Sequence, residues 1–187
     1  MRKIASLFQR NYEGDRQVRD EIVEGSEWVG NGEGVATRKY DGTCCMIRDG
    51  VLFKRYEVKR GKTPPENFEP ANDVDSNTGK QQGWVPVGDG NEDRWHREAF
   101  EALDTKANGT YELMGPKVQG NLEGYQEHVL LPHSASTVLD DCPRSFAELR
   151  DYLAENAIEG IVWHHEDGRM VKIKGKDFGI RRVPYEA

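Results

Sequence analysis

The clearest pattern along the chain is a pair of β-rich runs at residues 35–48 and 51–58. Apolar, β-branched and cysteine residues recur in both runs, and Asp49-Gly50 separates them. An Asp-Gly pair between two such runs is typical of a type I′ turn. The pattern therefore predicts a β-hairpin with its turn at Asp49 and Gly50.

Further strands are predicted at residues 109–114 and 127–132. A second hairpin is predicted from the runs 159–164 and 169–174, because the turn-forming residues 166–168 lie between them. The alternation of strand segments along the chain favours mostly antiparallel pairing.

Two helices are predicted from apolar spacing. Residues 92–104 have apolar side chains every three or four positions. Ser145 and Glu148 match a capping box, which predicts that a second helix begins after Ser145. Its core face is expected to consist of Phe146, Leu149 and Leu153.

The remaining long segment, residues 61–91, is rich in proline, glycine, Asn and Asp and is predicted to be a loop with a short strand near 84–87. Residues 12–34 have no clear pattern. We expect a single α+β domain over residues 1–187, with mostly antiparallel sheets and flanking helices.

Composition restricts the class of protein. Apolar residues make up 36% of the 187 residues and charged residues 32%, which indicates a soluble, globular chain. No apolar run approaches the ~18 residues of a membrane span, and the N-terminus has no apolar core of a secretory signal. Cys44 and Cys45 are neighbours that point to opposite faces of a strand, so we expect reduced cysteines and a cytoplasmic location.

The net charge of −7 argues against a general nucleic-acid binder. Bases nevertheless concentrate at residues 54–62 and 169–182. Such islands suit contacts to a few phosphates, although solvated strand faces explain either island equally well. The candidate RNA-binding residues are Lys54, Lys59, Arg60 and Lys62.

A lysine motif carries the candidate chemistry. The stretch from Thr37 to Thr43 places Lys39 at the end of a strand, before a turn that contains Asp41 and Gly42. Lys-x-Asp-Gly alone is a common hairpin sequence. Its weight comes from the residues that follow in order, namely Arg55, Glu112 in Glu-Leu-Met-Gly-Pro, Glu159 in Glu-Gly-Ile-Val, and Lys172 and Lys174 in Val-Lys-Ile-Lys.

These elements resemble the nucleotidyltransferase motifs of the ATP-dependent ligase and capping-enzyme superfamily. Lys39 to Gly42 resembles the nucleophile motif, and Glu112 to Asn121 is similar to the third motif of RNA ligases. The stretch through Cys45 further resembles a small single-domain RNA ligase family. The resemblance covers about residues 33–178 and implies an ATP-grasp-like adenylation domain.

The resemblance also implies a reaction, in which the amine of Lys39 attacks the α-phosphate of ATP to form lysyl-AMP. That amine must be neutral, whereas a free lysine has a pKa of about 10.4, so neighbouring cations and burial are expected to lower it. The implied catalytic residues are Lys39, Lys172 and Lys174. The implied ATP-binding residues are Thr37, Arg38, Lys39, Arg55, Glu112, Glu159, Lys172 and Lys174, with Glu159 also a ligand of Mg²⁺ or Mn²⁺.

Within these roles, Glu112 is expected to bind the ribose hydroxyls, and Arg55 the sugar or a phosphate. Lys172 and Lys174 are two residues apart and so share one strand face. Asp41 is expected to shape the turn, and Gly42 to supply a positive φ. Taken singly, Glu112 and Glu159 are more simply interpreted as acidic surface residues that flank turns.

Three functions remain open: an RNA ligase of RNA repair that joins 5′-phosphate and 3′-hydroxyl ends, a DNA ligase or capping-type enzyme, and a non-catalytic nucleotide- or RNA-binding module. The chain continues only briefly beyond Lys174, where DNA ligases and capping enzymes have an OB-fold, so no OB-fold is expected. We expect RNA ends and ATP as partners, with no membrane and no stable protein partner.

Other kinds of site find little support in the sequence. The five histidines lack zinc spacing and do not pair with the cysteines along the chain. Trp84, Trp95 and Trp163 are expected in the core rather than as platforms for base stacking. The strand at 127–132 lacks the aromatic residue that stacks on adenine in the resembled family, so Val129 or Leu131 is the expected substitute.

Overall fold

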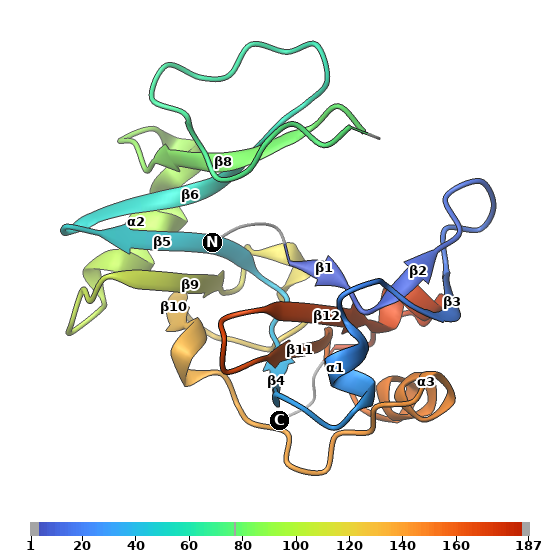
Figure 1. Cartoon of the computed structure of the whole chain (residues 1–187). Coiled ribbons are helices and arrows are strands. Elements are labelled where there is room, and N and C mark those ends of the chain that lie inside the picture. Colours follow the sequence, from blue (N-terminus) through green and yellow to red (C-terminus); the bar gives the residue numbers. More distant parts are fainter. Residues whose placement is uncertain (1–3, 77, 185–187) are drawn as a thin grey trace. The chain divides into compact units, whose positions relative to one another are not determined.

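The computed structural model describes residues 4–76 and 78–184, which divide into two compact units (Figure 1). The central unit comprises Gly42–Ala135, and the terminal unit comprises Ile4–Asp41 together with residues 136–184. Each unit has its own sheet and its own apolar core. The single-domain organisation predicted for residues 1–187 stays a prediction.

The central unit is built on a six-stranded sheet in the order β10-β9-β5-β6-β8-β7, in which every neighbouring pair is antiparallel. Its strands are β5 Thr43–Arg48, β6 Val51–Val58, β7 Glu69–Pro70, β8 Gln81–Pro86, β9 Gly109–Met114 and β10 Val129–Pro132. Its helices are α2 Arg94–Glu101 and the short 3-10 turns η1 Asn91–Asp93, η2 Gln119–Asn121 and η3 His133–Ala135. One face of the sheet is covered by apolar residues, with Ala99 of α2 packed among them.

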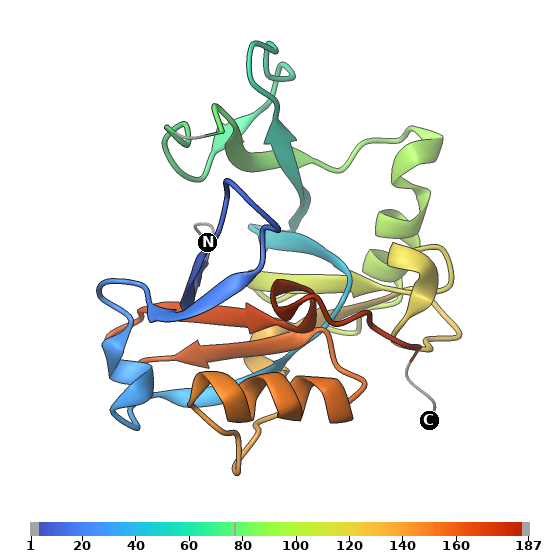
Figure 2. The same ribbon diagram turned by 90° about the vertical axis from the view of Figure 1, so that its right-hand side faces the viewer.

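The terminal unit contains a four-stranded sheet in the order β1-β12-β11-β4, and only β1 runs parallel to its neighbour. Its strands are β1 Ala5–Ser6, β4 Val35–Lys39, β11 Gly160–His164 and β12 Met170–Lys174, with a separate pair β2 Phe8–Arg10 and β3 Val18–Ile22. Its helices are α1 Glu27–Gly30, α3 Phe146–Glu155 and the 3-10 turn η4 Gly175–Phe178. Helix α3 lies along the four-stranded sheet (Figure 2). Its Leu149 and Leu153 belong to the same apolar core as Ile161 of β11.

The first hairpin is confirmed at its turn but begins later than predicted. Asp49 and Gly50 have φ of 52° and 77°, as a type I′ turn requires. The run 35–48, however, is two strands in two different sheets, because β4 pairs with β11 whereas β5 pairs with β6 and β9. Periodicity alone does not show that a β-rich run changes sheets.

Most other elements are confirmed, including the second hairpin, β9, β10 and both helices. In α3 the Ser145 hydroxyl donates to the Glu148 carboxylate, 2.5 Å away, instead of accepting from the backbone as a capping box would. The segment 61–91 is more ordered than predicted, because β7 and β8 extend the central sheet from β6. Residues 12–34, left without a prediction, include β3 and α1.

The fold class is therefore α+β with mostly antiparallel sheets, as predicted. Across residues 4–76 and 78–184, no helix combines the length and apolar character needed to cross a bilayer.

Candidate active site

Four polar residues share one face of the terminal sheet. Gly160 of β11 lies directly opposite Lys39 on one side and Lys174 on the other. Val162 of the same strand lies directly opposite Thr37 on β4 and Lys172 on β12. Directly opposed residues in antiparallel strands project to the same face of the sheet. We call this surface the lysine face, and it consists of Thr37, Lys39, Lys172 and Lys174.

The reverse face of the same strands forms the terminal core. Ile161 and Trp163 of β11 are fully buried, as is Ile173 of β12. The alternation Val-Lys-Ile-Lys thus places its aliphatic residues in the core and its two lysines on the opposite face. Burial of the aliphatic residues fixes the strand register, and the register positions the lysines.

Gly160 keeps the centre of the lysine face free of a side chain. A Cβ at this position would lie 2.2 Å from the carbonyl oxygen of Ile173, a backbone atom of the next strand. Gly160 separates Lys39 from Lys174 in the register, so the position between these two lysines on the sheet carries no side chain of its own.

Glu159, the residue before β11, is the acidic partner of this face. Its carboxylate forms an ion pair with Lys39 and lies 3.8 Å from the amine of Lys174. Burial raises the pKa of Glu159, and Asp41 raises it further, while Lys39 lowers it. Lys39 and Glu159, both predicted to bind the nucleotide, therefore lie in contact in the structure.

The pKa of Lys172 is lowered to about 8, first by burial and then by the positive charges of Lys39 and Lys174. Burial and like charge both disfavour the protonated amine. The lysine motif predicts these two effects for the amine of Lys39, where they stay a prediction. The structure shows them at Lys172.

Not every predicted nucleotide-binding residue lies on the lysine face. The hydroxyl of Thr37 donates to the carbonyl of Val162, 3.2 Å away, and lies 3.0 Å from His164 Nε2. Arg38 projects to the other side of β4, where its guanidinium lies 4.7 Å from the centre of the Tyr40 ring. The structure thus brings Thr37 and Lys39 together and separates Arg38 from them.

In the central unit, Glu112 and Arg55 also share a sheet face. Glu112 lies directly opposite Cys44 on β5. Because Cys45 pairs with Lys54, the neighbouring residues Cys44 and Arg55 project to the other side of the sheet. We call this side the Glu112 face, and it includes Cys44, Arg55, Glu112 and Leu131.

Arg55 is held on the Glu112 face by Trp84. Its guanidinium lies 4.6 Å from the centre of the Trp84 ring, a cation–π contact. Burial lowers the pKa of Arg55, but an arginine remains charged at any physiological pH. Trp84 is 4% exposed and Trp163 is fully buried, which confirms the core positions predicted for both. Trp95 is only half-buried and stacks on His128, with the ring centres 4.3 Å apart, so the core position predicted for it was wrong.

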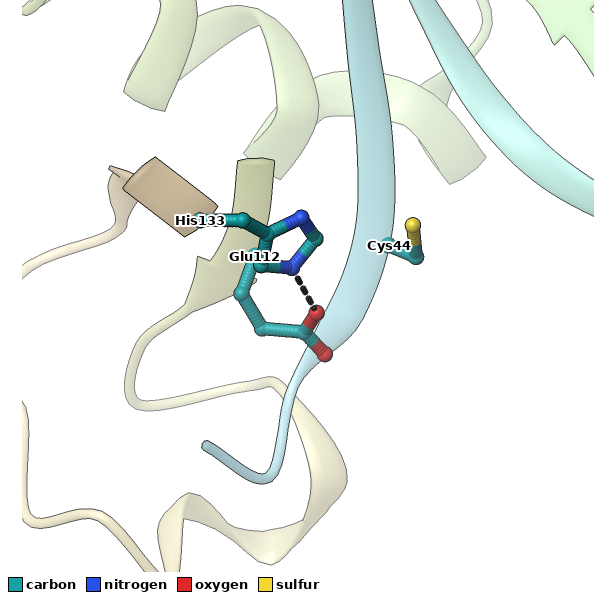
Figure 3. A group of neighbouring side chains, drawn as sticks. All are labelled: Cys44, Glu112 and His133. Atoms are coloured by element: carbon teal, nitrogen blue, oxygen red, sulfur yellow. Dashed lines mark hydrogen bonds and ion pairs between the residues drawn. The ribbon is translucent and has the colours of Figure 1, made fainter. Parts of the chain in front are cut away.

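Neutral or weakly basic donors surround the Glu112 carboxylate. The backbone N–H of Gly42 donates to one oxygen at 3.1 Å, and His133 Nε2 lies 3.0 Å from the other (Figure 3). The second ring nitrogen of His133 lies 2.9 Å from the Thr110 hydroxyl. Glu112 is buried and its two oxygens are each engaged, so its orientation is fixed.

Gly42 is needed for a different reason than predicted. Its φ is not positive, but a Cβ would lie 2.2 Å from the carbonyl oxygen of Leu113 and 2.8 Å from Cγ of Glu112. The expectation of a positive φ was wrong, and close approach to β9 explains the glycine. The motif at residues 39–42 therefore supplies Lys39 to the terminal unit and a backbone donor for Glu112 to the central unit.

Leu131 lies directly opposite Glu112, and Val129 opposite Met114, so both aliphatic side chains share the face of Glu112. Each is partly exposed. An adenine-contacting role for Val129 or Leu131 stays a prediction.

The candidate RNA-binding residues fall into two groups. Lys59, Arg60 and Lys62 are exposed on the turn after β6. Lys54 instead forms an ion pair with the buried carboxylate of Asp93, and it projects to the side of the sheet opposite Arg55. An exposed basic surface thus includes three of the four residues, without Lys54.

Two residues of the Glu112 face were missed by sequence reasoning. His133 and Cys44 come from different segments, and no spacing rule joins positions 44, 112 and 133. Histidines and cysteines have no zinc spacing along the chain, yet ligand atoms of Cys44, Glu112 and His133 lie within 4.8 Å of one another in the structure. Only the strand register could have revealed this cluster.

Comparison with known proteins finds similarity to RNA ligases. Residues 98–186 match the protein-family model described as RNA ligase 1, a range that includes Glu112, Glu159, Lys172 and Lys174. The match confirms the resemblance to RNA ligases that the motifs indicate.

Individual relatives carry the same description. The chain is 25% identical to RNA ligase 1 of Danio rerio over 219 residues, an alignment that covers 78% of this chain and 67% of the relative. It is 24% identical to RNA ligase 1 of Rattus norvegicus and of Mus musculus with the same coverage. These similarities are consistent with an RNA ligase.

Proposed function

We propose that this protein is an ATP-dependent RNA ligase that joins 5′-phosphate and 3′-hydroxyl ends through lysyl-AMP and AMP-RNA intermediates. The observation that carries the proposal is the lysine face, where Lys39 is paired with Glu159 and shares its sheet face with Lys172 and Lys174. The similarity to proteins described as RNA ligase 1 supports RNA as the substrate.

The first step requires Lys39 to lose a proton. Its ion-pair partner Glu159 is the nearest acceptor, and burial raises the pKa of this carboxyl toward that role. Glu159 passes this proton on to solvent, which leaves a neutral Lys39 amine and an ionised Glu159 carboxylate. The amine then forms an N–P bond to the α-phosphorus of ATP, and the bond to pyrophosphate breaks.

Lys172 and Lys174 stabilise the negative charge of the phosphoryl group during this step. Charged groups fixed in a partly buried site act more strongly than they do in water. The pKa of about 8 leaves Lys172 mostly protonated at pH 7, and a bound phosphate anion favours its protonated form further.

A divalent cation fits beside these residues. Mg²⁺ and Mn²⁺ prefer oxygen ligands and bind nucleotides through few protein carboxylates, and Glu159 offers one partly exposed carboxylate near two of the lysines. The cation, when bound, would neutralise part of the phosphate charge.

The nucleoside is assigned to the Glu112 face. Glu112 accepts hydrogen bonds from the ribose hydroxyls, and Arg55 contacts the sugar or a phosphate. The exposed bases Lys59, Arg60 and Lys62 contact RNA phosphates.

Intact mass spectrometry tests the proposal. Incubation with ATP and Mg²⁺ should add roughly 329 Da, the mass of one adenylyl group, because the lysine forms a covalent intermediate. Lys39→Ala should abolish the adduct, whereas Lys176→Ala, an exposed lysine of the same unit, should retain it. The absence of an adduct with every nucleotide would refute the ligase proposal, and an adduct formed only with GTP would favour a capping-type enzyme.

Sealing is tested with the adenylated protein. Strands with 5′-phosphate and 3′-hydroxyl ends should be joined when they are RNA. Joining of DNA ends alone would show that the protein is a DNA ligase.

A further inference from the structure

The Glu112 face contains a group of side chains with an unusual mixture of donor atoms. Sγ of Cys44, a carboxylate oxygen of Glu112 and a ring nitrogen of His133 all lie within 4.8 Å of one another. Figure 3 shows the His133 ring facing the Glu112 carboxylate, with Cys44 on the neighbouring strand β5. All three belong to the central unit.

This donor set selects a particular class of metal ion. A thiolate, an imidazole and one carboxylate suit Zn²⁺ and Co²⁺, whereas Mg²⁺ prefers oxygen atoms alone. Three protein ligands with one open position are typical of zinc sites that keep a water or an exchangeable ligand. This mixed donor set therefore selects a different kind of metal ion from the Mg²⁺ or Mn²⁺ assigned to Glu159.

Two of the proposed ligand residues are also oriented by hydrogen bonds to neighbouring groups. His133 turns one ring nitrogen toward Glu112, and its other nitrogen lies 2.9 Å from the Thr110 hydroxyl. The second oxygen of Glu112 accepts from the backbone N–H of Gly42. Such outer contacts orient metal ligands and fix the tautomer of a ligating histidine.

We propose that Cys44, Glu112 and His133 form a site for a transition-metal ion of the Zn²⁺ class, with an exchangeable ligand in the fourth position. On binding, the Cys44 thiol releases its proton to solvent and forms a metal–sulfur bond. The hydrogen bond between His133 and Glu112 is replaced by one metal bond to each residue, and His133 then carries its proton on Nδ1, which donates to Thr110. One proton is released for each ion bound.

Metal binding at this site has a consequence for the ligase reaction, and this consequence rests on the proposed function. Glu112 cannot hold the metal and the ribose hydroxyls with the same oxygen. Zn²⁺ at micromolar concentration should therefore inhibit formation of lysyl-AMP, and ATP should relieve the inhibition.

Titration of the metal-free full chain with Co²⁺ tests the site directly. The wild type should bind one ion and show a thiolate-to-cobalt charge-transfer band, which Zn²⁺ should then remove by displacement. Cys44→Ser should lose the band, and His133→Gln, which removes a ligand, should weaken binding by more than the loss of an outer contact does, that is by more than about 100-fold. Thr110→Val, which removes only the contact behind His133, should weaken it by about 10–100-fold.

Cys142→Ser is the matched control, because Cys142 is a half-buried cysteine of the terminal unit. It should bind Co²⁺ like the wild type. An unchanged spectrum and affinity in Cys44→Ser, or a wild-type spectrum without the charge-transfer band, would overturn the site. X-ray absorption of the wild-type zinc complex needs no variant, and a first shell without sulfur would overturn the site as well.

The inhibition experiment separates the two proposals. His133→Gln should make the adenylation rate less sensitive to added Zn²⁺, measured as the ratio of rates with and without the ion. If Co²⁺ binds with the expected spectrum but Zn²⁺ and ATP do not compete, the ribose role of Glu112 is wrong and the metal site stands. A charge-transfer band in a protein that forms no lysyl-AMP would refute the ligase proposal alone.

Discussion

The lysine face and the Glu112 face differ in the kind of group that surrounds the carboxylate of each. On the lysine face, the amines of Lys39 and Lys174 lie around the single carboxylate of Glu159, and Lys172 contributes a third positive charge. On the Glu112 face, one carboxylate is held by a backbone N–H and an imidazole. A cluster of cations suits phosphoryl groups, whereas a buried carboxylate held by two hydrogen-bonding groups suits hydroxyls or a metal ion. Charged groups on the two faces should therefore affect different kinetic constants.

The largest effect is expected on the lysine face. Glu159→Ala and Lys172→Ala should each slow formation of lysyl-AMP by at least about 10²-fold, the scale of loss when a positioned electrostatic group is removed. Single-turnover rates with labelled ATP provide the measurement. Glu155→Ala, at the exposed end of α3, is the control for general effects on the terminal unit. Near-normal rates in both variants would show that the lysine face is not the site of the reaction.

A smaller and different effect is expected at Glu112. Glu112→Gln removes the charge but keeps one acceptor, so the KM for ATP should rise by about tenfold, in the range of a lost hydrogen bond to a charged group. The rate at saturating ATP should change much less. Glu127→Gln, an exposed position of the central unit, is the control. An equal loss in the saturated rate would mean that both faces act on the same step.

The pKa of Lys172 predicts an effect on stability. Its pKa of about 8 lies below the unfolded value of 10.5, so the unfolded chain binds more protons between these values and stability rises with pH across that window. Below pH 8, Lys172 is charged in the folded protein, and its burial lowers the free energy of unfolding by the full amount. Lys172→Met should therefore increase the free energy of unfolding at pH 7 by on the order of 1 kcal/mol, after allowance for partial solvent exposure.

Denaturant unfolding at several pH values measures this effect. The gain from Lys172→Met should shrink as the pH approaches 10, whereas Lys176→Met at an exposed position should give no pH-dependent gain. A constant difference at all pH values would show that packing, not the charge, is responsible.

The smallest effect is expected at the exposed bases of the central unit. Combined replacement of Lys59, Arg60 and Lys62 by alanine should reduce the salt dependence of RNA binding by about 0.7 log units per lost contact for each tenfold change in salt. Sealing should weaken, while formation of lysyl-AMP stays close to normal. The pair Lys106→Ala and Lys117→Ala removes exposed charge elsewhere in the same unit and should leave the salt slope unchanged. Normal sealing by the triple variant at physiological salt would place the RNA elsewhere.

The sequence predicts the lysine face more fully than the Glu112 face, for a physical reason. Lys172 and Lys174 stand two residues apart within an aliphatic strand, and this period directly specifies a shared face. Lys39 and Glu159 belong to motifs that the resemblance places in one nucleotide site, although their ion pair was not predicted. Strand alternation and the motif resemblance therefore both place these residues on one surface.

The Glu112 face depends on strand register between distant segments, which periodicity does not specify. Cys44 lies opposite Glu112 because β5 pairs with β9, and His133 reaches the same carboxylate from the turn after β10. The division of residues 35–48 between two sheets was missed for the same reason. Positions on a strand can be predicted from alternation, but partners across strands require the fold.

Gly160 makes one codon of this chain unusually intolerant of change. Every other amino acid carries a Cβ, and at this position that single carbon would meet the backbone of Ile173 at 2.2 Å. The collision is the same whether the new side chain is small or large, so chemical similarity gives no protection. In a saturation library, all nineteen missense alleles at this codon should therefore be depleted together, with alanine lost alongside the charged and aromatic residues. Uniform loss of this kind is a genetic signature of backbone contact, distinct from the graded tolerance expected at an exposed site such as codon 176.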